Sequence, residues 1–361
     1  MKKARNLIIW IIISIFVQTG ILYYMNNYMF KNISKVSYKI IKTNDNKKKV
    51  VSVSIPGDAD NIQISYTGKY ASYTSNSSLH VIKMSSGEDK TVPLDCSFDN
   101  AYSKWRNSED RLLIIEKGSS GIKVYKYDPS NGDKQQALDY NNKARTYELT
   151  RSSSNITGLE TNDLNTIMYL KETNGKQLSY IDRLDISGEL QKFQMGLKRI
   201  GDYYVFKAED KVIFEDLAAN KISVATSGSC NDINIPGVSN PKLIDVDNEG
   251  NLYVGNVVND KVNEIYTASL NKKSSGSEDS TFTLNWDKTA LKQPVDSKDI
   301  YVSDLGEIYT VNRLKGKVSN IKTGKAISFN NMYITMYGDS ENGGIISRDL
   351  ENNKLIETLI K

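Results

Sequence analysis

The chain has 361 residues, of which 39% are hydrophobic and 25% charged, with a formal net charge of +4 and a mean hydropathy of -0.47. This composition is typical of a globular protein, and it excludes a collagen-like, wholly disordered or polytopic membrane protein. One histidine and two cysteines also exclude a histidine-rich metal site and a disulfide scaffold.

The charge is distributed unevenly along the chain. Residues 1–50 contain ten lysines and arginines but only one acid, Asp45, so the remaining 311 residues carry a net charge of −5. A mildly acidic body that follows a strongly basic N-terminal region argues against a nucleic-acid-binding body. We therefore expect no nucleic acid among the partners.

The first predicted element is a transmembrane helix over residues 7–25. These nineteen residues carry no charge, and at about 1.5 Å per residue a helix of this length spans roughly 28 Å of lipid bilayer. Three cations precede the span, which predicts a cytoplasmic N-terminus over residues 1–6 and an extracytoplasmic C-terminal body. The expected location is the cell membrane, with a single pass.

A cleaved signal peptide is the alternative interpretation of the same residues. A signal peptide ends at a small-residue cleavage site, whereas bulky residues such as Tyr23, Tyr24 and Met25 stand here. We therefore favour an uncleaved signal anchor. Residues 26–49 follow as a basic juxtamembrane neck, whose seven lysines fit either a solvated spacer, which we favour, or contact with anionic headgroups.

Residues 50–361 are predicted to be an all-β domain built from repeats. Short β-branched or aromatic runs alternate with polar turns, and the turns recur about every 44 residues. The turns are Ser86–Glu88, Asn131–Asp133, Ser187–Glu189, Asn220–Lys221, Asn271–Lys272, Thr323–Lys325 and Asn352–Lys354. Seven turns predict a seven-bladed β-propeller, with six blades as the alternative. Val50–Ile55 and Lys354–Ile360 are expected to pair and close the ring.

Two further turns are similar to each other in sequence. Asp247–Tyr253 and Asp304–Tyr309 each place a glycine before an apolar residue and a tyrosine. A glycine at a hairpin turn supplies positive φ, and the apolar–Tyr pair begins the next strand.

The first repeats also resemble a known family. The segment Ile64–Tyr73, followed by Leu79–Val81 and Ser86–Glu88, resembles a blade of the WD40-like propellers found in TolB and at the N-terminus of dipeptidyl-peptidase IV. Trp105–Ile114 resembles the opening of a second such blade. Thr67 departs from the pattern, since those blades usually have Asp there. The resemblance implies a propeller but no particular activity.

Residues with recognisable chemistry are scarce in this chain. There is no Gly-x-Ser-x-Gly motif, and His80 is predicted to be an ordinary strand residue. Cys96 and Cys230 lie in separate repeats and are expected to be free thiols. Asp245–Gly250 resembles the first half of a calcium-binding loop, but Asn256 stands where a bidentate Glu is needed, which favours a blade turn. No catalytic, cofactor-binding or metal-binding residue is therefore nominated, and no cofactor is expected.

By elimination, the predicted function is a non-catalytic binding or scaffold module for an envelope protein or glycan, which would bind one propeller face. The alternative is an envelope enzyme that acts on glycans through carboxylates in the propeller channel. A passive spacer is a third class. Several acids at one channel mouth would favour the enzyme, whereas an apolar or tyrosine-rich rim would favour protein binding. Tyr140–Asn155 and Lys272–Ser280 are candidate contact loops.

The predicted anchor has a direct test. Because a span of nineteen uncharged residues is held by the hydrophobic effect, alkaline carbonate should not extract the full chain from membranes. A variant that lacks residues 1–25 should be extracted, which immunoblotting of pellet and supernatant will show. An N-terminus beyond residue 20 on the mature protein, found by N-terminal sequencing, would contradict the uncleaved anchor.

Overall fold

The computed structural model describes most of the chain beyond residue 50. It covers residues 51–119, 121–138, 143–144, 146–147, 154–162, 167–185, 190–193, 195–206, 210–270 and 284–360, together with Ser14, Val17–Gly20 and Tyr23–Tyr24. The chain divides into two compact units, Met1–Lys48 and Lys49–Lys361, and each is described by itself.

In the first unit, the described residues are all helical. Within the part of the chain that the structure describes, no helix combines the length and the apolar character needed to cross a bilayer. Residues 1–6, the neck at 26–49 and most of the span at 7–25 lie outside the described residues. The anchor therefore stays a prediction.

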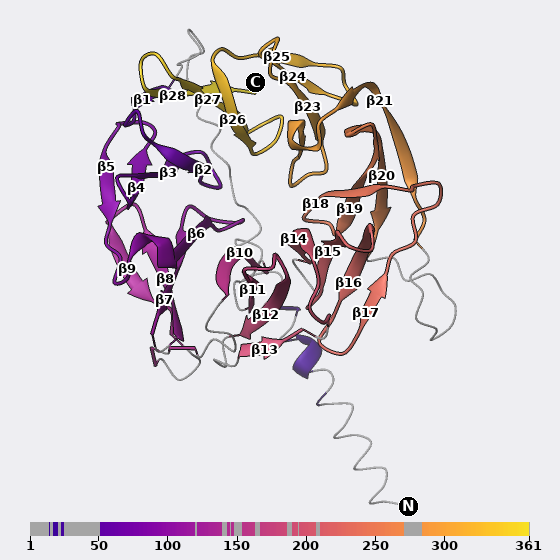
Figure 1. Ribbon diagram of the computed structural model, residues 1–361, viewed down its shortest axis with the longest axis horizontal. Coiled ribbons are helices and arrows are strands. Elements are labelled where there is room, and N and C mark those ends of the chain that lie inside the picture. The colour runs from indigo at the N-terminus through magenta and orange to yellow at the C-terminus, as the bar shows by residue number, and fades with distance from the viewer. Residues whose placement is uncertain are drawn as a thin grey trace, which may run out of the picture. The chain divides into compact units, whose positions relative to one another are not determined.

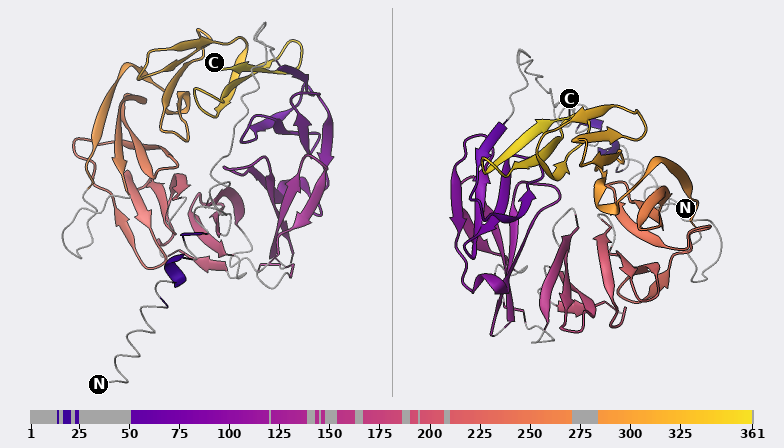
Figure 2. Two further views of the ribbon diagram at one scale, coloured as in Figure 1. Left: turned by 180° about the vertical axis from the view of Figure 1, so that it is seen from behind. Right: turned by 45° about the horizontal axis from the view of Figure 1, so that its top comes forward.

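The second unit contains seven four-stranded antiparallel sheets, which form the blades of a ring (Figures 1 and 2). This arrangement is a seven-bladed β-propeller, so the all-β prediction is confirmed and the six-bladed alternative is wrong. Two single-turn 3-10 helices, η2 (Phe98–Asn100) and η3 (Ser297–Asp299), precede the inner strands of blades 2 and 6.

Within blades 1 to 6, the strands follow the chain from the innermost to the outermost. Blade 1 contains β2 (Asp60–Ile64), β3 (Tyr70–Ser75), β4 (Ser78–Lys83) and β5 (Asp89–Val92). Blade 2 contains β6 (Ala101–Trp105), β7 (Leu112–Gly118), β8 (Gly121–Asp128) and β9 (Asp133–Gln136). Blade 3 contains β10 (Asn155–Thr161), β11 (Ile167–Thr173), β12 (Ser179–Asp185) and β13 (Leu190–Lys192).

The later blades repeat this order until the last one. Blade 4 contains β14 (Ile200–Val205), β15 (Val212–Asp216), β16 (Lys221–Ala225) and β17 (Cys230–Asp232). Blade 5 contains β18 (Pro241–Val246), β19 (Asn251–Val258), β20 (Lys261–Ser269) and β21 (Asp287–Val295). Blade 6 contains β22 (Ile300–Val302), β23 (Ile308–Asn312), β24 (Lys317–Asn320) and β25 (Ala326–Ser328).

Blade 7 is assembled from both ends of the domain. Its inner strands are β26 (Met332–Tyr337), β27 (Gly344–Asp349) and β28 (Lys354–Leu359), and its outermost strand is β1 (Val51–Ser54). β1 pairs with β28 in antiparallel register from Val51 opposite Glu357 to Ser54 opposite Lys354. The predicted pairing of the terminal strands is therefore confirmed, and it closes the ring.

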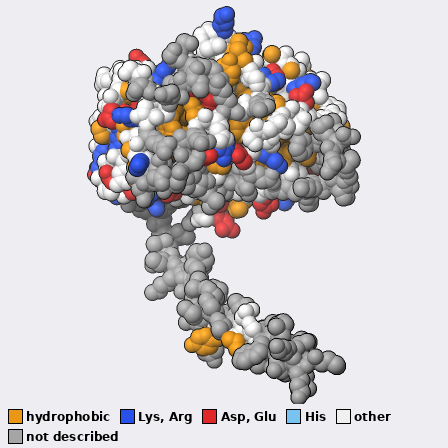
Figure 3. All heavy atoms as spheres, turned by 90° about the horizontal axis from the view of Figure 1, so that it is seen from below, with side chains coloured by type: hydrophobic (Ala, Val, Ile, Leu, Met, Phe, Trp, Pro, Cys, Tyr) orange, Lys and Arg blue, Asp and Glu red, His pale blue; other side chains and the backbone are white. Residues whose placement is uncertain are grey.

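The hydrophobic core lies between the blades rather than in one central cluster. The described residues form seven buried clusters, and each cluster joins one pair of neighbouring blades. Both faces of a blade are therefore apolar and covered, as expected for sheets that stack radially. Figure 3 shows the propeller from its side, where acidic and basic side chains are interspersed among the coloured residues.

The predicted turns fall at two different places in a blade. Ser86–Glu88, Asn131–Asp133 and Thr323–Lys325 connect third strands to fourth strands, whereas Asn220–Lys221 and Asn352–Lys354 connect second strands to third strands. The remaining two turns lie outside the described residues. Glycines and asparagines with positive φ occupy both kinds of turn. This mixture explains the uneven spacing of the turns in the sequence.

Ring closure can be tested at Val53, which is buried in the cluster that joins blade 7 to blade 1. Val53→Asp places a carboxylate in this apolar site and should lower the free energy of unfolding by at least about 3 kcal/mol. Ser52→Asp on the exposed face of the same strand is the control, with an expected change within about 0.5 kcal/mol. Urea denaturation will measure both, and equal effects of the two changes would contradict the closure.

Candidate functional site

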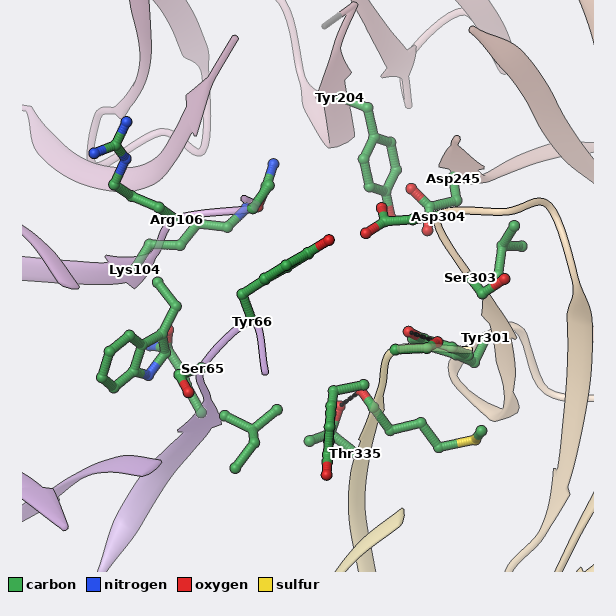
Figure 4. Close-up of a pocket in the computed structure, with 18 of the residues that line it drawn as sticks. Ser65, Tyr66, Lys104, Arg106, Tyr204, Asp245, Tyr301, Ser303, Asp304 and Thr335 are labelled. Atoms are coloured by element: carbon green, nitrogen blue, oxygen red, sulfur yellow. Dashed lines mark hydrogen bonds between the residues drawn. The ribbon is translucent and has the colours of Figure 1, made fainter. Parts of the chain in front are cut away.

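A cavity of about 400 Å³ lies on the propeller axis, where the innermost strands end. We call this side the inner-turn face, because each innermost strand turns there into the second strand of its blade. Residues at the ends of β2, β6, β10, β14, β18, β22 and β26 line this central cavity. All seven blades therefore contribute to it (Figure 4).

Four tyrosines line the cavity, namely Tyr66, Tyr204, Tyr301 and Tyr337. Tyr204 donates its hydroxyl to the Ile244 carbonyl of blade 5 at 2.6 Å, and Tyr301 donates to the Gly338 carbonyl after blade 7's inner strand at 2.8 Å. Because these hydroxyls are held by the neighbouring blade, the two rings are fixed along the wall. Tyr66 comes from the β2–β3 turn and is 40% exposed. Figure 4 shows its hydroxyl directed across the cavity toward Asp304 and Tyr204.

Two carboxylates converge on one side of the cavity. Asp245 belongs to β18 of blade 5, and Asp304 belongs to the β22–β23 turn of blade 6. Figure 4 shows both of them beside the Tyr204 ring. Asp245 also accepts the Val246 backbone N–H at 2.8 Å, which fixes its carboxylate. Neighbouring blades thus bring these two acids to one place.

The lining also contains the carboxylates of Glu160 and Asp247. Glu160 forms an ion pair with Lys104 across blades 3 and 2. Asp247 is buried and accepts the backbone N–H groups of Glu249 and Asn251 and the hydroxyl of Tyr253. The segment that resembles half of a calcium loop is therefore a blade turn between β18 and β19, as predicted, with Asp247 as its internal acceptor.

A close approach of two blades explains one glycine of the matched turns. Gly306 has φ +75°, and a Cβ there would lie 2.6 Å from the Tyr253 hydroxyl and 3.0 Å from an Asp247 carboxylate oxygen. Only glycine fits both the backbone angle and this space. The similar turns at Gly250 and Gly306 both follow an innermost strand, and both glycines have positive φ, as the sequence predicted.

The cations of the lining are engaged with acids. Arg106 is buried and pairs with Glu109 through its guanidinium, and burial lowers its pKa to about 10, which leaves it protonated at neutral pH. Lys104 reaches Glu160, as described above. A second cavity of about 250 Å³ shares Lys104, Glu160 and Tyr204 with the first, so this ion pair lies between the two cavities.

The residues considered for catalysis in the sequence lie elsewhere. His80 is a residue of β4, as predicted, and its ring stacks on Tyr73 with centroids 5.0 Å apart. Cys96 and Cys230 are free thiols, which confirms that prediction, and burial raises the pKa of both. None of these three side chains lines the central cavity.

The candidate contact loops can be placed only in part. Lys272–Ser280 lies outside the described residues. In Tyr140–Asn155, Tyr147 exchanges two backbone hydrogen bonds of 2.8 Å with Ile122, so this residue of the segment lies against β8 of blade 2.

The cavity residues were not predicted, although the turns after the innermost strands could have indicated them. Tyr66, Asp245 and Asp304 each stand two to five positions before the positive-φ glycine of such a turn.

Comparisons with known proteins agree with the fold. Neither a protein-family model nor a curated protein matches the chain. Among solved structures, an oligogalacturonate lyase in complex with manganese matches with a TM-score of 0.55 and 10% identity, over 84% of this chain and 91% of that one. The Cps50 (Swd1) β-propeller domain of Myceliophteria thermophila matches with a TM-score of 0.51 and 10% identity, over 86% and 98%. At this identity the likeness shows the propeller fold alone, and the resemblance to TolB stays a prediction.

Alkaline pH should destabilise the protein through its cavity tyrosines. Burial, with Asp245 and Asp304 nearby, raises the pKa of Tyr204 and Tyr301 well above the usual value of about 10. Below about pH 10 these phenols are neutral in both states, and above it only the unfolded chain loses the protons. Unfolding free energy should therefore fall as pH rises beyond about 10, and Tyr301→Phe should reduce that slope. If Tyr301→Phe leaves the dependence of the unfolding free energy on pH unchanged, Tyr301 is not a source of the alkaline destabilisation.

Proposed function

We propose that the protein is a non-catalytic binding module, anchored in the cell membrane and displayed on its extracytoplasmic side. The central cavity at the inner-turn face is its binding surface. The observation that carries this proposal is the tyrosine-lined cavity to which all seven blades contribute. Tyrosines are enriched where proteins bind partners, because they bring a large rigid surface with a polar tip. The expected partner is an envelope protein or an envelope glycan.

The state of the carboxylates favours binding over hydrolysis. Glycan hydrolysis needs one carboxylic acid and one carboxylate on opposite sides of the bond to be cleaved. In the central cavity, Glu160 is paired with Lys104, and Asp247 is the internal acceptor of a turn. These two acids are thus committed to protein contacts. The convergence of Asp245 and Asp304 is the observation that supports the alternative, an enzyme acting on envelope glycans.

Site-specific crosslinking tests the binding surface. A photoreactive phenylalanine analogue at position 66 places the probe on the exposed rim of the cavity, and the same analogue at position 314 is the control. Leu314 is fully exposed in the β23–β24 turn on the opposite face. We expect a reproducible crosslinked envelope component from position 66 and not from position 314, in intact cells and by mass spectrometry.

The alternative function has its own outcome. If the purified chain cleaves envelope glycans, and if Asp245→Asn or Asp304→Asn abolishes the cleavage without lowering the thermal midpoint, the protein is an enzyme. Crosslinks that arise only at position 314 would place the binding surface on the opposite face. Either result would overturn the proposed function.

A further inference from the structure

We propose that the central cavity binds an organic cation, a primary ammonium or guanidinium group. Such a group can come from a lysine or arginine side chain of a protein partner or from a free polyamine. This inference rests on the proposed function, because it names the ligand class of the same cavity.

The charges of the lining are the first argument. Four carboxylates and two cations line the cavity, and both cations are already engaged, Lys104 with Glu160 and Arg106 with Glu109. Three of the four carboxylates, Asp245, Asp247 and Asp304, belong to the neighbouring blades 5 and 6, so the acidic part of the lining lies there. Charges in a partly enclosed site are screened less than charges on an open surface. The cavity therefore attracts cations.

The aromatic wall is the second argument. The hydroxyls of Tyr204 and Tyr301 are donated to backbone carbonyls, so the rings themselves lie along the cavity. An ammonium or guanidinium group over such a ring is attracted by the negative face of the π-system. Figure 4 shows Tyr204 beside Asp245 and Asp304, with the hydroxyl of Tyr66 pointing toward them. A cation placed there would meet ring and carboxylate at once.

The raised pKa values of the two wall tyrosines agree with a cation site. After burial, the first cause that raises the pKa of Tyr204 is the charge of Asp245, and for Tyr301 it is the charge of Asp304. The same negative potential that resists ionisation of a phenol stabilises an incoming cation.

The geometry favours an organic cation over a metal ion. Across the described residues, no group of three or more His, Cys, Asp or Glu side chains is arranged to hold a metal. Two carboxylates fill only part of the coordination sphere that a metal ion needs, whereas carboxylates beside aromatic rings suit a group that carries both positive charge and apolar surface. The volume of about 400 Å³ is also in the range of organic ligand sites.

The test uses the full chain in detergent and a displayed library of short random peptides. We expect the wild-type protein to enrich peptides that share an arginine or lysine at one position. Replacing that residue by citrulline or norleucine should weaken binding about tenfold or more, and so should the double change Asp245→Asn with Asp304→Asn. Asp260→Asn, in the exposed β19–β20 turn of the opposite face, is the matched control and should keep the affinity.

Separate arms distinguish the sources and the two proposals. Calorimetry with spermidine shows whether a free polyamine is enough for binding. Comparing the affinities of Tyr66→Leu and Tyr66→Phe separates the contribution of the aromatic ring from that of the hydroxyl. Peptides that bind the cavity without a basic residue, or that bind equally well after the Asp245 and Asp304 changes, would contradict the proposed cation ligand. They would still support the proposed function as a binding module. Absence of binding to both peptides and spermidine would also contradict the proposed cation ligand. If no envelope component is crosslinked from position 66, in contrast, the proposed function itself is contradicted.

Discussion

The structure depends on one constraint, that no blade can bury its hydrophobic surface alone. Each four-stranded sheet has apolar side chains on both faces, and each of the seven buried clusters draws residues from two blades. An open row of blades would expose one face at either end. Only a closed ring covers the apolar faces of every blade. Here four residue pairs between β1 and β28 close the ring.

The central cavity is a product of the same constraint. Its contacts run between blades rather than within them: Lys104 to Glu160, Tyr204 to Ile244, and Tyr301 to Gly338. Asp245 and Asp304 also come from neighbouring blades. No single repeat contains the site, so its geometry exists only when the ring is complete. This property gives a rigid surface from units that are separately too small to fold.

The abundance of tyrosine, 22 residues, has a structural reason that composition alone does not reveal. Buried tyrosines in several blades donate their hydroxyls to carboxylates, so the ring packs between sheets while the polar end is satisfied. The pairs are Tyr73–Asp89, Tyr125–Asp95, Tyr169–Asp210, Tyr253–Asp247, Tyr309–Glu307 and Tyr337–Glu357. Tyrosine thus serves here as a core residue as well as a surface one.

Local patterns predicted the architecture well and the site poorly. Strand runs, turn residues and terminal strands act over short distances, and they correctly indicated seven blades and their closure. Contacts between side chains of different blades, in contrast, have no pattern that can be recognised in the local sequence. Thr67, which breaks the family pattern, binds Asp110 of the next blade through its backbone N–H and hydroxyl, so the expected carboxylate is supplied by another repeat. The partnership of Asp245 with Asp304 is equally non-local.

Ring closure also sets the order in which the chain can fold. β1 is the first strand of the domain to be synthesised, yet its partner β28 follows roughly 300 residues later. During synthesis β1 therefore waits with unpaired backbone groups until the last blade has been made, and loop-closure entropy opposes its final pairing. An unpaired strand is a template for aggregation. Any cell that makes this protein must keep its first strand from pairing wrongly until its last strand arrives.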